Sequence, residues 1–301
     1  MSQRAMLASG RRAATRRPQR LLTIESPLPQ AHFMLRLLEP PGSSREALWA
    51  RLQGGSYNKP FVLDQGPRRL LRFDFGAIQS AMLLSSPQRL LLAYTREMMT
   101  FLLFNADPRR LLLLGLGGGS IAKFCYQRLP RTDITAVEVS ADVIALRGEF
   151  SIPDDDARFR VVHADGAAYV AASAARVDVI VADACDGAGI AAPFNTTAFY
   201  RRARSRLAPG GVFVTNICGE ESARAGHLRK LRDAFDNEVL TLRIAPGRNV
   251  IAFAFRDTHA TPSRKQLLAA ADALKRRFGI NFPKYALHLE PARQPRTARG
   301  R

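Results

Sequence analysis

Two carboxylates three residues apart lie in the segment Asp183-Ala184-Cys185-Asp186, directly after the apolar stretch Val177–Ala182. The apolar stretch has the length of a buried strand, and open α/β sheets bind their ligands at the carboxyl ends of such strands. An amine with a pKa of about 10.4 arrives protonated at neutral pH and needs a group that orients it and takes its proton. We expect Asp183 to accept that proton and Asp186 to hold a second cationic group. The alternative is that Asp183 only caps the turn after the strand.

A glycine-rich segment precedes this pair in the chain. Gly115, Gly117 and Gly119 lie in the segment Gly115-Leu116-Gly117-Gly118-Gly119, which follows an apolar stretch and ends at Ser120, where a helical pattern begins. Glycines let the backbone turn tightly and approach a ligand closely, and the N–H groups at the start of a helix face that ligand. The segment by itself could equally be a tight loop.

Two further acidic positions lie at the ends of the next two strand-like stretches. Glu138 ends one stretch, where nucleotide-binding folds place the acid that holds ribose hydroxyls. Asp165-Gly166 ends the other, where a carboxylate can accept a hydrogen bond from an adenine amino group. Either acid alone could be a solvated strand end or a helix cap. Together with the glycines they favour binding of an adenosyl-sulfonium nucleotide of the S-adenosylmethionine type.

The order of elements predicts the sheet that brings these residues together. Strand-like and helical stretches alternate from residue 110 to residue 235 in the order 110–114, 121–128, 133–137, 141–150, 159–162, a short helix after Gly166, 177–182, 197–207, 212–217 and 223–235. Two strands, 238–244 and 249–255, then follow each other without a helix, and a last helix covers 263–278. Alternation predicts a mostly parallel sheet with helices on both faces, and the final pair predicts an antiparallel hairpin at its edge. The expected class is α/β, a Rossmann-like class I S-adenosylmethionine-dependent transferase fold.

The first third of the chain has a different pattern. Short strand-like stretches broken by turn signals lie between residues 33 and 85, and a helical stretch, 89–104, follows Pro87. We expect a small N-terminal β-hairpin domain at 21–88 and a Rossmann-like catalytic domain at 89–290. The expected tails are 1–20 and 291–301.

The tails account for much of the formal net charge of +19. Residues 1–20 contain six arginines and residues 291–301 contain four, and neither tail contains an acid. We expect both tails to be disordered, because they have almost nothing to bury. An acid-free, arginine-containing N-terminus can also be a transit peptide, but a solvated arm or a start codon placed too early is favoured. Contact with nucleic acid is expected only through these tails.

Other features of the composition exclude several classes. No stretch approaches the ~20 uninterrupted apolar residues that span a bilayer, so no membrane partner is expected. Cys125, Cys185 and Cys218 are widely spaced and predict neither a disulfide framework nor a metal site. A cytoplasmic location without a metal is expected, and a homodimer is compatible with the sequence.

The chain resembles the spermidine synthase (polyamine aminopropyltransferase) family over residues 56–257. The similarity is carried by Tyr57-Asn58, Gly76-Ala77-Ile78-Gln79, Glu97-Met98-Met99, the glycine-rich segment, Val137-Glu138, Ala164-Asp165-Gly166, Asp183-Ala184-Cys185-Asp186, Phe199-Tyr200 and Leu207-Ala208-Pro209-Gly210-Gly211. The resemblance implies that Asp183 is the proton acceptor and that Asn58, Glu138, Asp165 and Gly166 contact the nucleoside. It also implies that Gln79, Tyr94 and Asp186 bind the small-molecule amine.

Three departures from the family pattern concern the substrates. The family's glycine loop ends in an Asp that holds the ammonium of the donor, where this chain has Ser120. The family's Tyr-His-Glu is replaced by Tyr94-Thr95-Arg96-Glu97, and its Asp-Pro-x-Gly-Pro by Asp186-Gly187-Ala188-Gly189-Ile190. The phrase from Gly115 to Ser120, together with Asn216, is also similar to spermidine-synthase-like methyltransferases.

Three functions are therefore compared. The first is aminopropyl transfer from decarboxylated S-adenosylmethionine to a polyamine such as putrescine. The second is methyl transfer from S-adenosylmethionine on the same fold, since the neutral Ser120 does not disfavour a donor with a carboxylate. The third is a non-catalytic binding protein, against which the pair Asp183 and Asp186 argues. The first is favoured by the breadth of the similarity.

Overall fold

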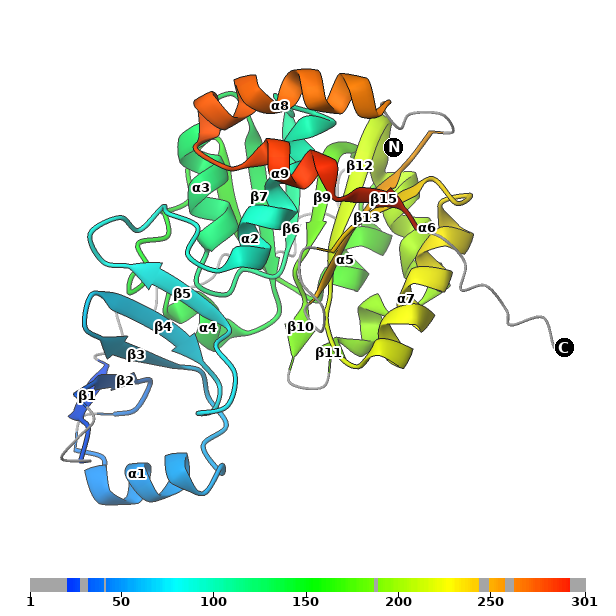
Figure 1. The fold of residues 1–301 in the computed structure, drawn as a ribbon. Coiled ribbons are helices and arrows are strands. Elements are labelled where there is room, and N and C mark those ends of the chain that lie inside the picture. Colours follow the sequence, from blue (N-terminus) through cyan, green and yellow to red (C-terminus); the bar gives the residue numbers. More distant parts are fainter. Residues whose placement is uncertain are drawn as a thin grey trace, which may run out of the picture.

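The structure is a computed structural model that describes residues 21–27, 32–40, 42–186, 189–243, 249–257 and 263–292. It has a larger body built around one eight-stranded sheet and a smaller five-stranded sheet at one end of that body (Figure 1). The expected tail 1–20 lies outside the described residues, as do residues 293–301.

The central sheet has the strand order β15-β13-β14-β12-β9-β6-β7-β8. Its parallel part consists of β6 (Arg110–Leu114), β7 (Asp133–Glu138), β8 (Phe159–His163), β9 (Val177–Ala182) and β12 (Leu207–Ile217). Its antiparallel edge consists of β13 (Val239–Leu242), β14 (Val250–Phe255) and β15 (Leu289–Pro291). The predicted fold class, a mostly parallel sheet that ends in an antiparallel hairpin, is confirmed.

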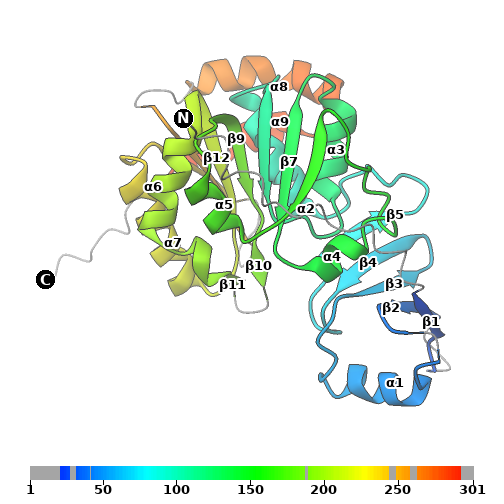
Figure 2. The same cartoon turned by 180° about the vertical axis from the view of Figure 1, so that it is seen from behind.

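Helices cover both faces of this sheet, as Figures 1 and 2 show from opposite sides. One face carries α2 (Ala93–Met98), η1 (Met99–Leu103), α3 (Ser120–Arg128), α8 (Arg264–Phe278) and α9 (Phe282–Leu287). The other carries α5 (Gly166–Ala172), α6 (Thr197–Arg206) and α7 (Glu221–Ala234). The leucines of β6 show why helices must cover both faces of the sheet. Leu111 and Leu113 pack into a first core, on the face of α3 and α8, and Leu112 and Leu114 pack into a second core, on the face of α6 and α7. Successive side chains of a strand point to opposite faces, so a continuous apolar run must be covered twice.

The smaller sheet is antiparallel throughout, as predicted. It consists of β1 (Leu22–Glu25), β2 (Met34–Leu37), β3 (Phe61–Gln65), β4 (Arg68–Arg72) and β5 (Ser80–Leu83), and α1 (Arg45–Gln53) connects β2 to β3. Arg36 of β2 and Arg69 of β4 both reach Glu149 of the larger body, at 2.9 and 3.1 Å. These charge pairs and the packing of Leu71 into the first core hold the small sheet against the larger body.

Two predicted helices are shorter than expected. The helix predicted at 89–104 begins only at Ala93, because the Arg96 guanidinium binds the carbonyls of Leu90 and Leu91 that a helix would use, and it tightens into η1. The helix predicted at 141–150 is α4 (Ala141–Ala145), after which the chain continues in turns with bonds from residue i+3 to residue i. Local hydrogen bonds therefore replace the regular helix in both places.

The C-terminal boundary of the fold lies slightly beyond the predicted position. Pro291 pairs with Leu240 in the central sheet, and the N–H of Ala292 donates to the Val239 carbonyl at 2.9 Å. The tail expected at 291–301 therefore begins after these residues. Three short elements were not predicted from the sequence, namely α1 with nine residues, α9 with six and β15 with three.

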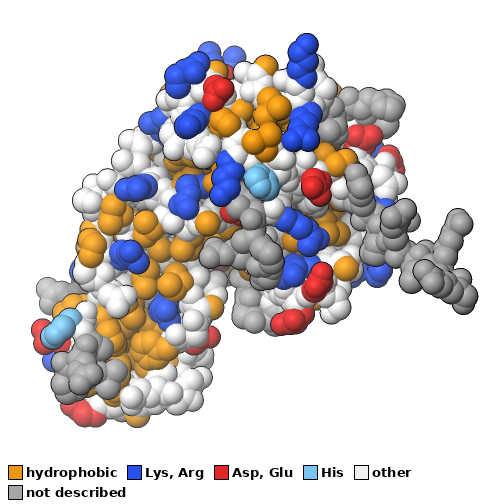
Figure 3. All heavy atoms as spheres, in the orientation of Figure 1, with side chains coloured by type: hydrophobic (Ala, Val, Ile, Leu, Met, Phe, Trp, Pro, Cys, Tyr) orange, Lys and Arg blue, Asp and Glu red, His pale blue; other side chains and the backbone are white. Residues whose placement is uncertain are grey.

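The surface shows how charge is distributed over the described part of the chain (Figure 3). Lys and Arg side chains are spread over the body that carries α8, whereas the part formed by the small sheet shows a larger apolar area. Among the described residues no helix is both long and apolar enough to cross a membrane.

Candidate active site

A cavity of about 700 Å³ lies at the carboxyl ends of β6, β7, β8, β9 and β12, and the small sheet covers one side of it. A volume of this size is typical of a small-molecule site. Most of the predicted site residues line it, namely Gln79, Tyr94, Gly115, Gly117, Ser120, Glu138, Asp165, Gly166 and Asp183. The parallel strands bring the residues from Gly115 onward together because their carboxyl ends share one edge of the sheet, whereas Gln79 directly precedes β5 of the small sheet and Tyr94 belongs to α2.

The glycine-rich segment turns from β6 into α3 and lies against the end of β9. Gly115 has φ +96°, and a Cβ atom there would lie 2.4 Å from the carbonyl oxygen of Asp183. Gly119 has φ +65° and precedes the first turn of α3, with Ile152 so close that a Cβ atom would lie 2.5 Å from it. Any larger residue at either position would separate the loop from its neighbours. The glycines are therefore required by the packing of the loop.

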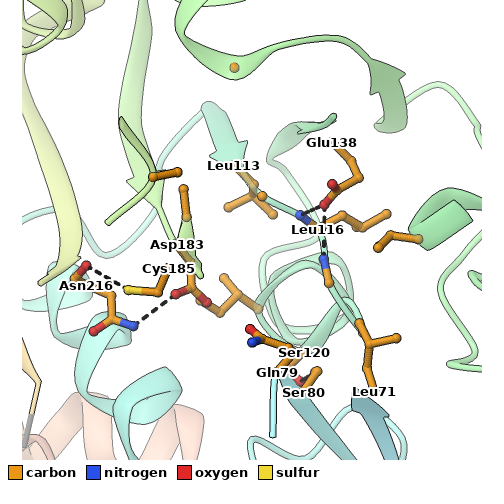
Figure 4. Close-up of a pocket in the computed structure, with 18 of the residues that line it drawn as sticks. Leu71, Gln79, Ser80, Leu113, Leu116, Ser120, Glu138, Asp183, Cys185 and Asn216 are labelled. Atoms are coloured by element: carbon orange, nitrogen blue, oxygen red, sulfur yellow. Dashed lines mark hydrogen bonds between the residues drawn. The ribbon is translucent and has the colours of Figure 1, made fainter. Parts of the chain in front are cut away.

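Glu138 holds the glycine loop in place. Its Oε2 accepts from the backbone N–H of Leu116 at 2.9 Å and from that of Gly117 at 3.4 Å, as Figure 4 shows. Its Oε1 accepts from the N–H of Ser140 at 2.9 Å. The side chain is almost fully buried and still lines the cavity. A change of this carboxylate therefore affects the shape of the loop as well as any ligand beside it.

Asp165 is a helix cap at the wall of the cavity. Its Oδ1 caps α5 by accepting from the N–H of Ala168 at 2.7 Å, and the residue also lines the cavity. Gly166 allows the ring of Phe194 to approach, because a Cβ atom at this position would lie 2.8 Å from the ring. The cap fixes the carboxylate at the wall of the cavity.

Asp183 is held by three groups from neighbouring elements. Its N–H donates to the carbonyl of Leu114 at 3.0 Å, and its Oδ1 accepts from Nδ2 of Asn216 at 3.1 Å (Figure 4). The hydroxyl of Tyr94 also donates to this carboxylate. Burial raises the pKa of Asp183, and the hydrogen bonds from Asn216 and Tyr94 oppose that shift. The carboxylate is therefore poised to bind a proton or a cationic group.

Tyr94 is itself buried against Asp183. Burial, and then the charge of Asp183, raise the pKa of Tyr94 well above its usual value, so the phenol stays protonated and acts as a hydrogen-bond donor. Tyr94 thus lines the cavity and donates a hydrogen bond to Asp183.

Two residues of the site were not identified by sequence reasoning. Asn216 is nearly fully buried near the end of β12; the sequence marked it only through the similarity to methyltransferases and did not predict its contact with Asp183. A polar residue in an otherwise apolar strand was the available signal. Ser80, the first residue of β5, is also buried, and its Oγ lies 3.2 Å from Oγ of Ser120. No pattern around Ser80 indicated that it would meet the glycine loop from a different sheet.

Two of the predicted residues whose side chains or backbone the structure describes, Asn58 and Gly119, do not line the cavity, and a third, Asp186, has a side chain outside the described part. Asn58 is exposed in the connection between α1 and β3 and is not among the residues that line the cavity. Gly119 is the N-cap of α3 and shapes the loop without lining it. The backbone of Asp186 lies in the short strand β10 (Cys185–Asp186), and its side chain is outside the part of the chain that the structure describes.

The prediction that the cysteines form no disulfide is wrong. Cys185 and Cys218 are joined by a disulfide bond, with their Cα atoms 6.4 Å apart, and Cys125 is a buried free thiol. The two cysteines are 33 residues apart in the chain, so their spacing did not reveal the pair. They meet because β9 and β12 are neighbours in the sheet. Within the described residues no group of three or more His, Cys, Asp or Glu side chains is arranged to hold a metal ion.

Comparison with known proteins identifies the family. A sequence profile of the spermine/spermidine synthase domain matches residues 91–240. The chain is 36% identical to a polyamine aminopropyltransferase of Chromobacterium violaceum over 234 residues, which cover 77% of this chain and 90% of the relative.

Solved structures agree on the fold. A probable spermidine synthase from Corynebacterium glutamicum superposes with a TM-score of 0.60 at 22% identity, covering 80% of this chain and 95% of that one. Human methyltransferase-like protein 13, solved in complex with SAH, superposes with a TM-score of 0.57 at 26% identity, covering 62% and 93% of the two chains. On the extent of the sequence match, the chain belongs to the spermine/spermidine synthase family of polyamine aminopropyltransferases.

Proposed function

We propose that the protein transfers an aminopropyl group from decarboxylated S-adenosylmethionine to a polyamine such as putrescine, with Asp183 as the proton acceptor. The observation that carries the proposal is the position of Asp183, which faces the same cavity as Glu138 and the glycine loop and is held there by Asn216 and Tyr94. Family membership supports the reaction class.

The donor supplies an activated carbon, since its leaving group is the neutral thioether methylthioadenosine. The attacking amine nitrogen forms a bond to the aminopropyl carbon as the bond from that carbon to sulfur breaks. Because a protonated amine has no free lone pair, Asp183 takes a proton from the bound ammonium before this attack, and the product nitrogen carries the positive charge that the sulfonium loses. A general base that is correctly placed contributes about 10²–10⁴-fold to the rate.

The environment of Asp183 suits this role. Burial raises its pKa toward that of the amine, which lowers the cost of proton transfer, while Asn216 and Tyr94 keep the carboxylate oriented. A cationic amine bound beside Asp183 would lower the pKa of this carboxyl group and so favour its charged form. In this proposal Glu138 binds the ribose and Asp165 the adenine of the donor, which is supported by the fact that both line the cavity.

The test is spermidine formation from putrescine and decarboxylated S-adenosylmethionine by the wild type and the Asp183→Asn variant. We expect turnover in the wild type and at least about a hundredfold lower kcat in the variant, with the Kd of methylthioadenosine changed by less than about threefold, because Asn has the same shape but cannot take the proton. The matched control is Asp133→Asn, at the exposed start of β7 on the opposite edge of the sheet, which should leave kcat unchanged.

Two outcomes would overturn the proposal. Equal turnover in the wild type and in Asp183→Asn would remove Asp183 from the chemistry. No spermidine from the wild type, together with tight binding of S-adenosylmethionine and none of its decarboxylated form, would favour methyl transfer instead.

A further inference from the structure

Two cysteines lie immediately beyond the pair formed by Asp183 and Asn216. Cys185 comes two residues after Asp183, and Cys218 comes two residues after Asn216. The hydrogen bond from Asn216 to Asp183 and the disulfide therefore connect the same two chain segments, two residues apart. Cys185 lines the cavity and is partly exposed, whereas Cys218 is 9% exposed.

The disulfide fastens one wall of the cavity to the end of β12. Cys185 begins the hairpin of β10 with β11 (Gly189–Ile190), where it pairs with Ile190, and the N–H of Ala191 donates to the carbonyl of Ala184 at 2.9 Å. Ala191 also lines the cavity. Each strand of this hairpin has two residues, so few backbone bonds hold it without the covalent link.

We propose that Cys185 and Cys218 form a thiol–disulfide modification site that controls how Asp183 is placed, and that a small disulfide such as oxidised glutathione is its exchange partner. This inference rests on the proposed function. A thiolate of the reduced pair attacks the small disulfide and releases one small thiol, and the second cysteine then displaces the other small thiol as the bond between Cys185 and Cys218 forms. Both cysteines are oxidised, the small disulfide is reduced to two thiols, and the protons pass to these thiols.

Reduction should act on the base and leave the nucleoside site intact. Two separate thiols cannot stay at bonding distance, so the sulfurs must move apart to van der Waals contact. Cys218 directly follows Ile217, which is fully buried at the end of β12 and should stay in place. Cys185 belongs to the short hairpin, so we expect the hairpin to move. A displacement of about 1 Å near reacting groups can cost on the order of 10²-fold in rate. Glu138 ends β7 and Asp165 lies between β8 and α5, so neither belongs to the two segments that the disulfide joins.

The third cysteine provides an internal control. Cys125 is fully buried in α3, and burial raises the pKa of its thiol well above the usual range. Since the thiolate is the reactive form, Cys125 should not exchange. The oxidised protein should therefore expose one free thiol on unfolding and the reduced protein three.

The experiment compares the full chain equilibrated with oxidised and with reduced glutathione. Thiols are counted by alkylation and mass measurement, kcat/KM is measured with putrescine, and the Kd of methylthioadenosine is measured by calorimetry. We expect one and three thiols, a kcat/KM at least about tenfold lower in the reduced form, and a Kd equal within about twofold. Cys185→Ser and Cys218→Ser should each behave like the reduced wild type and no longer respond, whereas Cys125→Ala should keep the full response.

Amide hydrogen exchange on the same samples separates this inference from the proposed function, because it needs no turnover. Faster exchange at Ile190 and Ala191 in the reduced form supports the inference, and equal exchange overturns it. The inference would also be overturned if the protein still had three free thiols after equilibration with oxidised glutathione. Equal kcat/KM in oxidised and reduced proteins that are both active would overturn it too. Absence of spermidine from both forms would overturn the proposed function alone.

Discussion

Asn216 donates a hydrogen bond from Nδ2 to Oδ1 of Asp183 across 3.1 Å, and it does so from β12, the strand next to the one that Asp183 follows. An amide donor stabilises the charged form of a carboxylate. The amide therefore opposes the burial that raises the pKa of Asp183. The proton affinity of the proposed base is set by the balance between burial and the hydrogen bonds from Asn216 and Tyr94.

The first prediction concerns the pH dependence of Asn216→Leu. Without the donor the pKa of Asp183 should rise further, so the acid limb of kcat/KM should move to higher pH by about one unit, since one unit corresponds to about 1.36 kcal/mol, within the range for hydrogen bonds to charged groups. Activity should recover on the high-pH plateau. A uniform loss of kcat/KM at every pH would mean that Asn216 acts on structure and not on the proton.

The second prediction separates Glu138 from Asn58. Glu138→Ala removes a carboxylate that holds the glycine loop and lines the cavity, so the Kd of methylthioadenosine should rise at least about tenfold, corresponding to ~1.5 kcal/mol. Asn58→Ala should leave this Kd unchanged because Asn58 is exposed and outside the cavity wall. Calorimetry checks both. A large effect of Asn58→Ala would restore the nucleoside contact that the family resemblance implies.

The third prediction concerns Lys123, a lysine that is 4% exposed beneath the small sheet. Burial lowers the pKa of Lys123 to about 8, and its Nζ donates to the carbonyl of Phe150. Between this value and the unfolded value near 10.5 the unfolded chain binds more protons, so the free energy of unfolding rises with pH in that window. At pH 7 the folded protein carries a desolvated charge. We expect Lys123→Met to raise the Tm at pH 7 and the difference from the wild type to shrink toward pH 10.

Thermal unfolding followed by circular dichroism measures this effect. Lys275→Met, at an exposed position of α8, is the control and should show no such pH-dependent difference. A lower Tm for Lys123→Met at pH 7 would mean that the bond to Phe150 outweighs the desolvation of the charge.

The parallel sheet and the edge where its strands end could be predicted because both depend on local patterns. The strands at Arg110–Leu114 and Val177–Ala182 are apolar runs bounded by turn residues, and their order predicts which ends meet. The contacts between Asp183 and Asn216, between Ser80 and Ser120, and between the two cysteines join distant segments. Each contact depends on which strands become neighbours and on how the two sheets pack against each other. The local pattern of apolar and turn residues does not contain that information.

The last prediction concerns Ser120, which stands where the family resemblance expects an Asp and whose Oγ lies 3.2 Å from Oγ of Ser80. Ser120 is the first residue of α3 and lines the cavity, so a carboxylate there would face the donor and would be stabilised by the helix dipole. Ser120→Asp should attract the ammonium of decarboxylated S-adenosylmethionine and repel the carboxylate of S-adenosylmethionine. We expect the ratio of the two Kd values to shift by at least about tenfold toward the decarboxylated donor, as a charged contact of ~1.4 kcal/mol would produce. Ser120→Asn is the matched control. The Asn side chain has nearly the same shape as that of Asp but carries no charge, so it should leave the ratio of the two Kd values unchanged. If Ser120→Asp changed both affinities equally, the donor's amino acid end would not lie beside Ser120, and the discrimination between donors would have to come from another part of the cavity.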